Sequence, residues 1–277
     1  MTSGTVAYLG PQGTFSEEAA ILYAPDSEHL PYPSIRDAAM AAESGETDEA
    51  VLPIENSIEG AVNMTLDYLI HDSTLSIVDE VVLDIRQCLI ATEGSRRTDI
   101  ETIRSHPQAL AQCQNFLERN FPNARLVASI STAGAVEEAL NEGKNSAAIG
   151  NRRAAELFGA SVLESGIEDN PNNMTRFVAM GSNGPPSSGD DKTSICFGFD
   201  SDTPGPLYGA LEEFARRKIN LTKIESRPTR HELGEYVFLV DMVGHRDDEP
   251  VASAIEAMER RVSQLRIFGS YSRRPAP

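Results

Sequence analysis

The chain has 277 residues, of which 40% are hydrophobic and 24% charged, enough for two folded domains of ordinary composition. Its 42 Asp and Glu residues against 24 Lys and Arg give a formal net charge of −18, which argues against nucleic acid as a partner. Lysine is scarce, and a lysine-poor acidic surface is typical of proteins that stay soluble in high salt, although a mesophilic acidic protein can share it.

The first residues of the chain and its cysteines bear on its cellular location and on whether it holds disulfides or a metal. Met1 leads directly into a strand-like run at residues 5–9, without the basic and apolar regions of a secretory leader. No later segment reaches the roughly 18 consecutive apolar residues of a membrane span. The three cysteines are far apart and lack paired spacing, so neither a disulfide framework nor a metal site is indicated. We therefore expect a cytoplasmic protein with no membrane partner and no metal.

The first two thirds of the chain predict an α/β fold with largely parallel strands, because short apolar runs alternate with helical patterns. Strands are expected at residues 5–9, 49–54, 100–105, 124–129, 146–150 and 175–180. The stretch 75–90 is too long for one ordinary strand. It indicates a chain that crosses between two lobes near residues 80–90 and returns near 165–175.

Helix starts are marked by capping patterns. Thr14 with Glu17 and Ser34 with Asp37 form capping boxes, and Pro107 suits the first turn of a helix. These patterns place helices directly after the strands at residues 5–9 and 100–105. The order strand, turn, helix is the one that α/β folds repeat.

A polar, Pro/Gly-rich segment at residues 182–192 predicts a linker between a domain at 1–181 and a second at 193–277. Beyond it the expected order is strand, helix, strand, strand, helix, strand, which is a ferredoxin-like βαββαβ unit. The predicted elements span residues 193–199, 206–218, 220–227, 235–242, 251–262 and 264–271.

Polar groups follow the predicted strands of the first domain. Gly13-Thr14 follows the first strand, Glu55-Asn56-Ser57 the second, and His106 with Gln108 the third. Gln112 lies one helical turn after Gln108, so both amides share a helix face. Ligands of α/β sheets bind beyond the carboxyl ends of the strands. Taken alone, the glycine turn and His106 favour a structural role, and Glu55-Asn56-Ser57 fits a capped loop as well as a site. Together these groups favour a site.

Asn172 to Phe177 places two amides, a hydroxyl and a guanidinium just ahead of an apolar strand. An Asx-type turn and a ligand-facing segment both fit this pattern. No Walker or dinucleotide fingerprint and no activated nucleophile pair accompanies it, so no cofactor is indicated. The chemistry then rests on orientation and hydrogen bonding, and a small anionic substrate suits it.

Ordered motifs along nearly the whole chain resemble those of the prephenate dehydratase family with a C-terminal ACT regulatory domain. They are Gly10–Phe15, Pro53–Gly60, Thr65–Asp67, His106–Ala109, Ser131–Ala133, Asn173–Phe177, Pro204-Gly205, Gly209–Leu211, Asn220–Ile224 and Glu225–Pro228. The resemblance implies a catalytic domain of two lobes, like those of periplasmic binding proteins. We expect a monofunctional protein, without a chorismate mutase-like domain ahead of the first strand. The implied reaction converts prephenate to phenylpyruvate by decarboxylation and dehydration in phenylalanine biosynthesis.

The resemblance also implies roles for residues of the catalytic domain. Thr175 is the expected catalytic hydroxyl. The expected substrate contacts are Gly13, Thr14, Asn56, Ser57, Gln108 and Asn173, together with Arg176, which either binds a carboxylate or braces the lobe. Glu55 and His106 are expected in supporting roles.

For the ACT domain the resemblance implies L-phenylalanine as effector, bound where two such domains pair in a homodimer or homotetramer. The expected effector-binding residues are Gly209, Ala210, Leu211, Asn220, Leu221, Glu225, Ser226, Arg227 and Pro228. Two alternatives stay open: an arogenate dehydratase, whose substrate has an amine in place of the keto group, and a non-catalytic amino-acid sensor.

Overall fold

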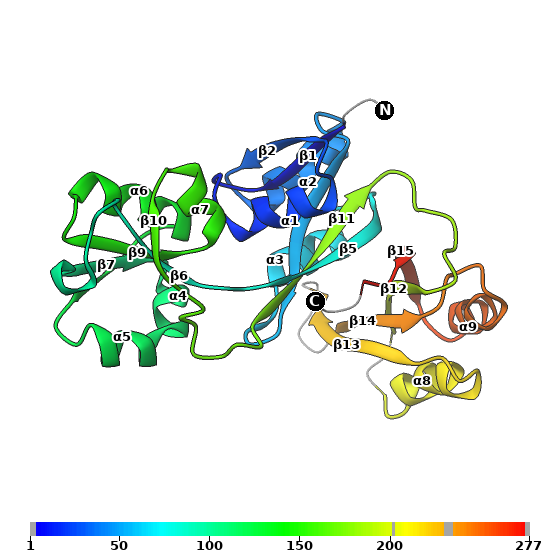
Figure 1. Ribbon diagram of the computed structural model, residues 1–277. Helices are drawn as coiled ribbons and strands as arrows, with labels where there is room; N and C mark the ends of the chain where they lie inside the picture. The colour runs from blue at the N-terminus through cyan, green and yellow to red at the C-terminus, as the bar shows by residue number, and fades with distance from the viewer. Residues whose placement is uncertain (1–3, 201–202, 230–234, 275–277) are drawn as a thin grey trace. The chain divides into compact units, whose positions relative to one another are not determined.

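The computed structural model describes residues 4–200, 203–229 and 235–274 (Figure 1). It divides into two compact units. The first holds the chain up to Leu66 and Val81–Phe177, and the second holds Asp67–Glu80 and the chain from Val178 onward. Among the described residues no helix has the length and apolar character needed to cross a membrane.

The first sheet has the strand order β2-β1-β3-β11-β5, with the short strand β4 paired to β3. Its strands are β1 (Thr5–Leu9), β2 (Glu28–Tyr32), β3 (Glu49–Asn56), β4 (Gly60–Ala61), β5 (Ser76–Asp84) and β11 (Met174–Gly181). The helices that alternate with them are α1 (Phe15–Tyr23), α2 (Ile35–Ser44) and α3 (Asn63–His71). β1 is parallel to both β2 and β3, as the alternating pattern predicted.

The second sheet has the order β10-β6-β9-β7-β8 and is mixed rather than largely parallel. Its strands are β6 (Cys88–Ala91), β7 (Thr102–Ser105), β8 (Arg125–Ala128), β9 (Ser146–Gly150) and β10 (Ser161–Ser165), and its helices are η1 (Arg97–Asp99), α4 (Pro107–Gln112), α5 (Gln114–Asn120), α6 (Thr132–Glu142) and α7 (Arg152–Leu157). β7 is parallel to β8 and β9, whereas β6 is antiparallel to β9 and β10. The expectation of largely parallel strands therefore fails at β6, the strand that follows the segment 85–87 from the first sheet.

Two segments join the sheets. Residues 85–87 lead from β5 to β6, and residues 166–173 lead back from β10 to β11. The segments bond to each other: Ile85 N–H donates to the Asn173 carbonyl at 2.8 Å, and Gln87 N–H donates to Glu168 Oε2 at 2.9 Å. The first unit therefore has two lobes connected by two non-strand segments that hydrogen-bond to each other.

Local capping works as the sequence predicted. Thr14 accepts from Glu17 N–H at the start of α1, and Glu17 Oε2 accepts from Gly13 N–H in return. Ser34 accepts from Asp37 N–H at the start of α2. Such reciprocal caps satisfy backbone donors that a helix start leaves free, and they fix the direction in which α1 leaves β1.

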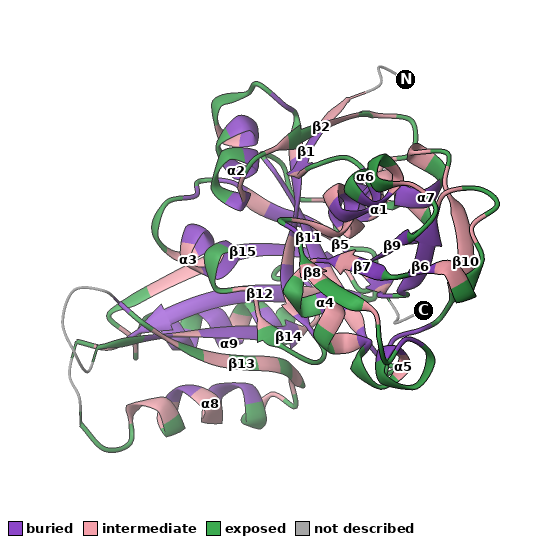
Figure 2. Cartoon of the chain, turned by 90° about the vertical axis from the view of Figure 1, so that its left-hand side faces the viewer, coloured by how far each residue is buried: buried purple, intermediate pink, exposed green. Residues whose placement is uncertain are grey.

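The second unit confirms the ferredoxin-like prediction. Its elements are β12 (Asp191–Gly198), α8 (Pro206–Arg216), β13 (Leu221–Pro228), β14 (Tyr236–Val243), α9 (Glu249–Glu259) and β15 (Gln264–Ser272), and the sheet order is β13-β14-β12-β15. Phe214, Val240 and Met258 belong to one buried cluster. Figure 2 shows buried residues along β12 and at positions on α8, in agreement with this packing.

The sequence did not predict β2 or β10. β2 reads Glu-His-Leu-Pro-Tyr, and β10 reads Ser-Val-Leu-Glu-Ser. Both are edge strands without a fully buried residue. A strand that buries little apolar surface shows no clear alternation, so its pairing depends on the neighbouring strand rather than on its own pattern.

The segment predicted as a linker has local structure at its end. β12 begins at Asp191, two residues before the predicted strand, and Asp191 is 2% exposed. Its carboxylate accepts from Ser187 Oγ, from the N–H and hydroxyl of Ser188, and from Gly189 N–H. Burial acts to raise the pKa of Asp191, but these hydrogen bonds outweigh it and hold the pKa below its ordinary value.

Replacing Asp191 with asparagine is expected to lower the free energy of unfolding by about 1–2 kcal/mol at pH 7, because the charged acceptor of this turn is lost. A lowered folded-state pKa stabilises the protein above the unfolded pKa, near 4, and that stabilisation disappears as the pH falls through the folded value. Urea unfolding of both proteins from pH 7 to pH 2 measures this. The two curves should converge in acid, and a constant gap at all pH values would contradict the assignment.

One ion pair in the second unit is deeply buried. Lys192 Nζ lies 2.8 Å from Glu80 Oε2 and 3.0 Å from Oε1, and the side chains are 11% and 1% exposed. Arg274 N–H also donates to Glu80 Oε1 at 3.1 Å. Lys192 stands on β12 and Glu80 on β5, so this pair binds the segment Asp67–Glu80 to the ferredoxin-like sheet within the second unit.

Candidate active site

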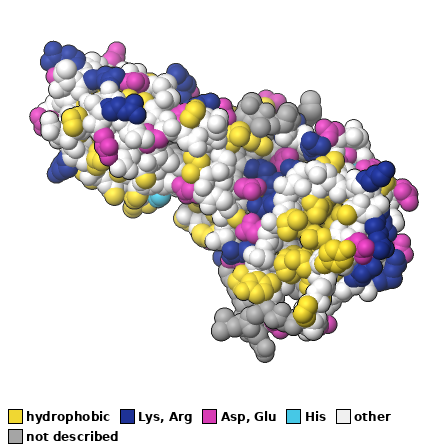
Figure 3. Space-filling view, turned by 90° about the horizontal axis from the view of Figure 1, so that it is seen from below, with side chains coloured by type: hydrophobic (Ala, Val, Ile, Leu, Met, Phe, Trp, Pro, Cys, Tyr) yellow, Lys and Arg dark blue, Asp and Glu magenta, His cyan; other side chains and the backbone are white. Residues whose placement is uncertain are grey.

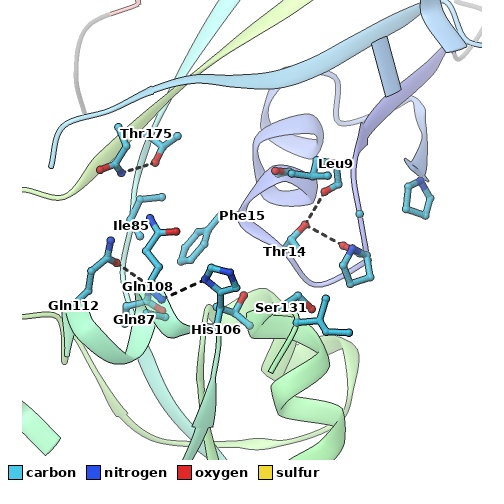
Figure 4. Close-up of a pocket in the computed structure, with 18 of the residues that line it drawn as sticks. Leu9, Thr14, Phe15, Ile85, Gln87, His106, Gln108, Gln112, Ser131 and Thr175 are labelled. Carbon is cyan, nitrogen blue, oxygen red and sulfur yellow. Dashed lines mark hydrogen bonds between the residues drawn. The ribbon is translucent and has the colours of Figure 1, made fainter. Parts of the chain in front are cut away.

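A cavity of about 680 Å³ lies between the two lobes of the first unit. It is lined by Leu9, Gly10, Pro11, Thr14, Phe15, Ser16, Pro31, Tyr32, Pro33, Asn56, Ile85, Gln87, His106, Gln108, Ala109, Gln112, Ile130, Ser131, Thr132 and Thr175. No Asp, Glu, Lys or Arg is among these lining residues. The site thus presents amides, hydroxyls and one imidazole on a largely apolar wall (Figure 4).

Thr175 and Asn56 meet at this cavity. Asn56 Nδ2 donates to Thr175 Oγ1 at 3.0 Å, and Asn56 Oδ1 accepts from Ile58 N–H and Glu59 N–H. Because two backbone donors fix the oxygen of Asn56, its nitrogen must face Thr175. Thr175 Oγ1 is therefore an acceptor in this bond, and its own proton is available for a ligand in the cavity.

The amide chain continues away from Thr175. Asn56 Nδ2 donates to Asn173 Oδ1 at 2.8 Å, Asn173 Nδ2 donates to Gln112 Oε1 at 3.1 Å, and Gln112 Nε2 donates to Glu59 Oε1 at 3.2 Å. Each link has one possible direction, since the carboxylate of Glu59 only accepts. Asn173 is 1% exposed and does not line the cavity, so it holds Asn56 and Gln112 rather than facing the cavity itself.

Gln112 and Gln87 belong to the site. The sequence placed Gln112 among the polar groups that favour a site without giving it a role, and it did not point to Gln87. Gln87 Nε2 approaches Gln112 Oε1 at 3.5 Å, and both side chains line the cavity (Figure 4). The spacing of Gln112 from Gln108 was a usable signal, because it sets the two amides on one face of α4. Gln87 lies in the segment between β5 and β6, where no local pattern marks it.

Two predicted substrate contacts are engaged with the backbone. Thr14 lines the cavity, but its hydroxyl donates to the Pro11 carbonyl at 2.9 Å and caps α1. Ser57 does not line the cavity: its hydroxyl donates to the Asn172 carbonyl at 3.0 Å and accepts from Met174 N–H at 2.9 Å. Ser57 thus fixes the start of β11 and with it the position of Thr175.

Arg176 and Glu55 lie outside the cavity lining and face each other. Arg176 Nε is 3.7 Å from Glu55 Oε2, and the arginine side chain is 12% exposed. Successive residues of a strand point to opposite faces, so Arg176 points away from the face on which Thr175 lies. Of the two roles expected for Arg176, bracing the lobe agrees with this placement.

Gly13 is likewise a packing position rather than a cavity-lining one. It has φ +81°, and a Cβ there would lie 3.2 Å from Ala133 Cβ and 3.3 Å from Ala154 Cα. Both neighbours belong to the other lobe, on α6 and α7. The missing side chain of Gly13 lets the two lobes approach closely.

Side chains also connect the lobes. Arg153 Nη2 lies 3.2 Å from Glu17 Oε1, and Asn151 Nδ2 donates to Glu18 Oε2 at 3.1 Å. Burial raises the pKa of Glu18 above its usual range, although the bond from Asn151 opposes that shift. These contacts join α1 to the start of α7 beside the cavity.

His106 caps α4 with its ring. Its Nδ1 accepts from Gln108 N–H at 3.3 Å, and Pro107 occupies the first turn as the sequence predicted. His106 and Gln108 both line the cavity (Figure 4). Five of the ten residues proposed for the catalytic domain therefore line one cavity: Thr14, Asn56, His106, Gln108 and Thr175.

The residues expected to bind an effector lie on α8, on β13 and in the turn between them. Ala210 is fully buried in the core of the second unit, and Leu211 packs against that core. Arg227 Nη2 forms an ion pair with Asp67 at 2.9 Å. Gly209, Asn220, Leu221, Glu225, Ser226 and Pro228 are at least partly exposed. Ala210 thus has a packing role here, and Arg227 is bound to the segment Asp67–Glu80.

Within the described residues, no cluster of three or more His, Cys, Asp or Glu side chains is arranged to hold a metal ion. The family model for prephenate dehydratase matches residues 6–185, and the model for the ACT domain matches residues 201–260. The chain belongs to the prephenate dehydratase family.

Individual relatives agree with the family match. The prephenate dehydratase of Mycolicibacterium gilvum is 42% identical over 283 residues, covering 96% of this chain and 90% of the relative. The crystal structure of a prephenate dehydratase in complex with L-Phe from Arthrobacter aurescens superimposes with a TM-score of 0.90 at 38% identity, covering 99% and 92% of the two chains. A structure described as GqqA, a novel type of quorum quenching acylase, has a TM-score of 0.89 at 30% identity and covers 98% of each chain.

Proposed function

We propose that this member of the prephenate dehydratase family converts prephenate to phenylpyruvate in the cavity that Thr175 lines. The observation that carries the proposal is the direction of the Asn56–Thr175 hydrogen bond. Since Thr175 accepts from Asn56, its proton is free for the ring hydroxyl of the substrate.

The reaction breaks two bonds of prephenate. The electron pair of the bond to the departing carboxylate enters the ring as carbon dioxide leaves, and the carbon–oxygen bond of the ring hydroxyl breaks with its electrons on oxygen. That oxygen leaves as hydroxide and becomes water by taking a proton from solvent. Thr175 donates a hydrogen bond to it as negative charge develops, which is an interaction stronger in the transition state than in the ground state.

The remaining residues hold this donor in place. Asn56 fixes Thr175, Asn173 fixes Asn56, and Ser57 fixes the backbone at the start of β11. Gln108 reaches the cavity from the other lobe and is our candidate for a direct substrate contact. The positioning matters because much of the driving force comes from forming an aromatic ring, so catalysis needs orientation more than strong acid.

Incubation of the purified protein with prephenate, and separately with arogenate, tests the proposal. Phenylpyruvate should form from prephenate, and the ratio of the two kcat/KM values decides between prephenate and arogenate dehydratase. If neither substrate yields an aromatic product, the two-lobed unit is better described as a binding protein.

An acyl-transfer reaction gains little support from the cavity. The hydroxyls of Thr14 and Ser131 cap α1 and α6, and His106 Nδ1 is occupied by Gln108 N–H. A nucleophile needs a neighbouring base to accept its proton. Among the lining residues, no hydroxyl forms a hydrogen bond with the ring of His106, as a nucleophile and its base would.

Regulation by L-phenylalanine is proposed for the second unit, on the basis of its ACT family match and the resemblance of the Glu225–Pro228 motif. Exposed apolar side chains of this unit include Tyr208, Ile224 and Tyr236. Figure 3 shows hydrophobic side chains gathered on part of the visible face, which suits pairing with a second copy. Gel filtration with and without phenylalanine, together with the activity assay, tests both the oligomer and the inhibition.

The domain boundaries near 181 and 193 and the cytoplasmic location remain predictions.

A further inference from the structure

We propose that His106 binds the carboxylate that the substrate keeps, through a hydrogen bond donated by its ring Nε2–H. The inference rests on the proposed function and adds a specific anchor for one end of the substrate. In this role His106 is a neutral hydrogen-bond donor and takes no part in proton transfer.

The tautomer of His106 follows from the cap of α4. Nδ1 accepts a hydrogen bond from Gln108 N–H, so in the neutral ring its lone pair is engaged there and the proton must lie on Nε2. No described residue accepts a hydrogen bond from Nε2. While Nδ1 accepts the bond from Gln108 N–H, Nε2 of the same ring carries a proton and has no free lone pair. Nε2 is therefore a hydrogen-bond donor.

The ring faces the cavity. Figure 4 shows the imidazole of His106 among the lining side chains, with the ring of Phe15 drawn next to it. It is partly exposed, and it is the only imidazole among the lining residues, which include no Lys or Arg. A substrate with two carboxylates needs donors in this cavity, and a ring N–H is one of the few that is not already engaged with the protein.

The chemistry selects which carboxylate His106 can hold. The departing carboxylate loses its negative charge as carbon dioxide forms, so a donor bound to it would stabilise the ground state more than the transition state and slow the reaction. The side-chain carboxylate keeps its charge throughout. A donor placed on it binds substrate, transition state and product equally, which lowers KM and leaves kcat unchanged.

The test uses His106→Asn, because asparagine is a good helix cap and retains the acceptor for Gln108 N–H while removing the ring donor. We expect KM for prephenate to rise about tenfold to a hundredfold, the range for losing a hydrogen bond to a charged group. The inhibition constant of phenylpyruvate should rise by the same factor, with kcat within about threefold of the original. The thermal midpoint should be unchanged.

His29→Asn is the matched control, since His29 lies on β2 outside the cavity lining and its ring contacts the Ala24 carbonyl. It should alter neither KM nor product inhibition. Unchanged constants in His106→Asn would overturn the inference. A raised KM with unchanged product inhibition and a changed kcat would place His106 at the departing carboxylate and also overturn it. Failure of the original protein to act on prephenate would instead refute the proposed function, and calorimetric binding of phenylpyruvate to both proteins would still decide the role of His106.

Discussion

Replacing Thr175 with alanine is expected to lower kcat at least about a hundredfold, because removal of one donor that meets developing charge on oxygen typically costs that much. Thr175 is 9% exposed as a residue and lines the cavity. Asn56 Nδ2 donates to this hydroxyl oxygen, which leaves the hydroxyl proton available to the substrate. Steady-state turnover of prephenate measures the effect.

The same substitution is expected to leave stability almost unchanged. Asn56 Nδ2 keeps its bonds to Asn173 Oδ1 at 2.8 Å and to the Met174 carbonyl at 3.2 Å when Thr175 Oγ1 is removed. The donor is therefore not left unsatisfied, which is the usual source of a large penalty.

Thr175→Ser and Thr175→Val serve as the paired controls. Serine retains the hydroxyl and should keep most of the activity, whereas valine retains the shape and should be as inactive as alanine. Near-normal turnover of the valine protein would remove the hydroxyl from the mechanism.

Replacing Lys192 with methionine is expected to lower the free energy of unfolding by about 3–5 kcal/mol, the usual cost of removing one partner of a buried ion pair. Glu80 is 1% exposed in its side chain and would lose its lysine counter-charge at 2.8 Å. The hydrogen bond from Arg274 N–H to Glu80 Oε1 remains in the variant. Urea or thermal unfolding measures the loss.

The double substitution Lys192→Met with Glu80→Leu separates charge from packing. Removing both charges should recover most of the stability, because a well-packed apolar pair can replace a buried ion pair at little cost. Arg96→Met is the surface control: Arg96 is 77% exposed beside Asp99 and should cost less than about 1 kcal/mol. Equal losses at positions 192 and 96 would show that burial of Glu80 does not matter.

Helix caps and the order of elements in the second unit were predicted correctly from the sequence. The caps at Thr14 and Ser34 are confirmed because a capping box depends on residues three positions apart. The βαββαβ order of the second unit was readable because its strands and helices have strong apolar faces. The edge strands β2 and β10 were missed because their own residues bury little apolar surface.

The candidate site was only partly readable, for a different reason. Asn56 stands at the carboxyl end of β3, where a ligand is expected, whereas Thr175 stands at the start of β11 and was assigned through the family resemblance. The structure brings both to the cavity. Ser57 binds the Asn172 carbonyl and Arg176 faces Glu55, and both contacts depend on how the strands pair in the folded sheet. Gln87 lies in a crossing segment without periodicity. Its position at the cavity follows from how the two lobes are joined, which no short stretch of sequence encodes.

The absence of full charges from the cavity lining separates two steps that salt would affect differently. The chain carries a net charge of −18, so a dianionic substrate approaches against a long-range repulsion that dissolved ions screen over about 8 Å at physiological ionic strength. Inside the cavity the substrate meets short-range dipoles of amides, hydroxyls and one imidazole, on which dissolved ions act little. Added salt should therefore speed the association of enzyme and substrate while leaving the rate of the bond-breaking step unchanged. With an acidic surface and a cavity lining that has no full charge, substrate association is the salt-sensitive step.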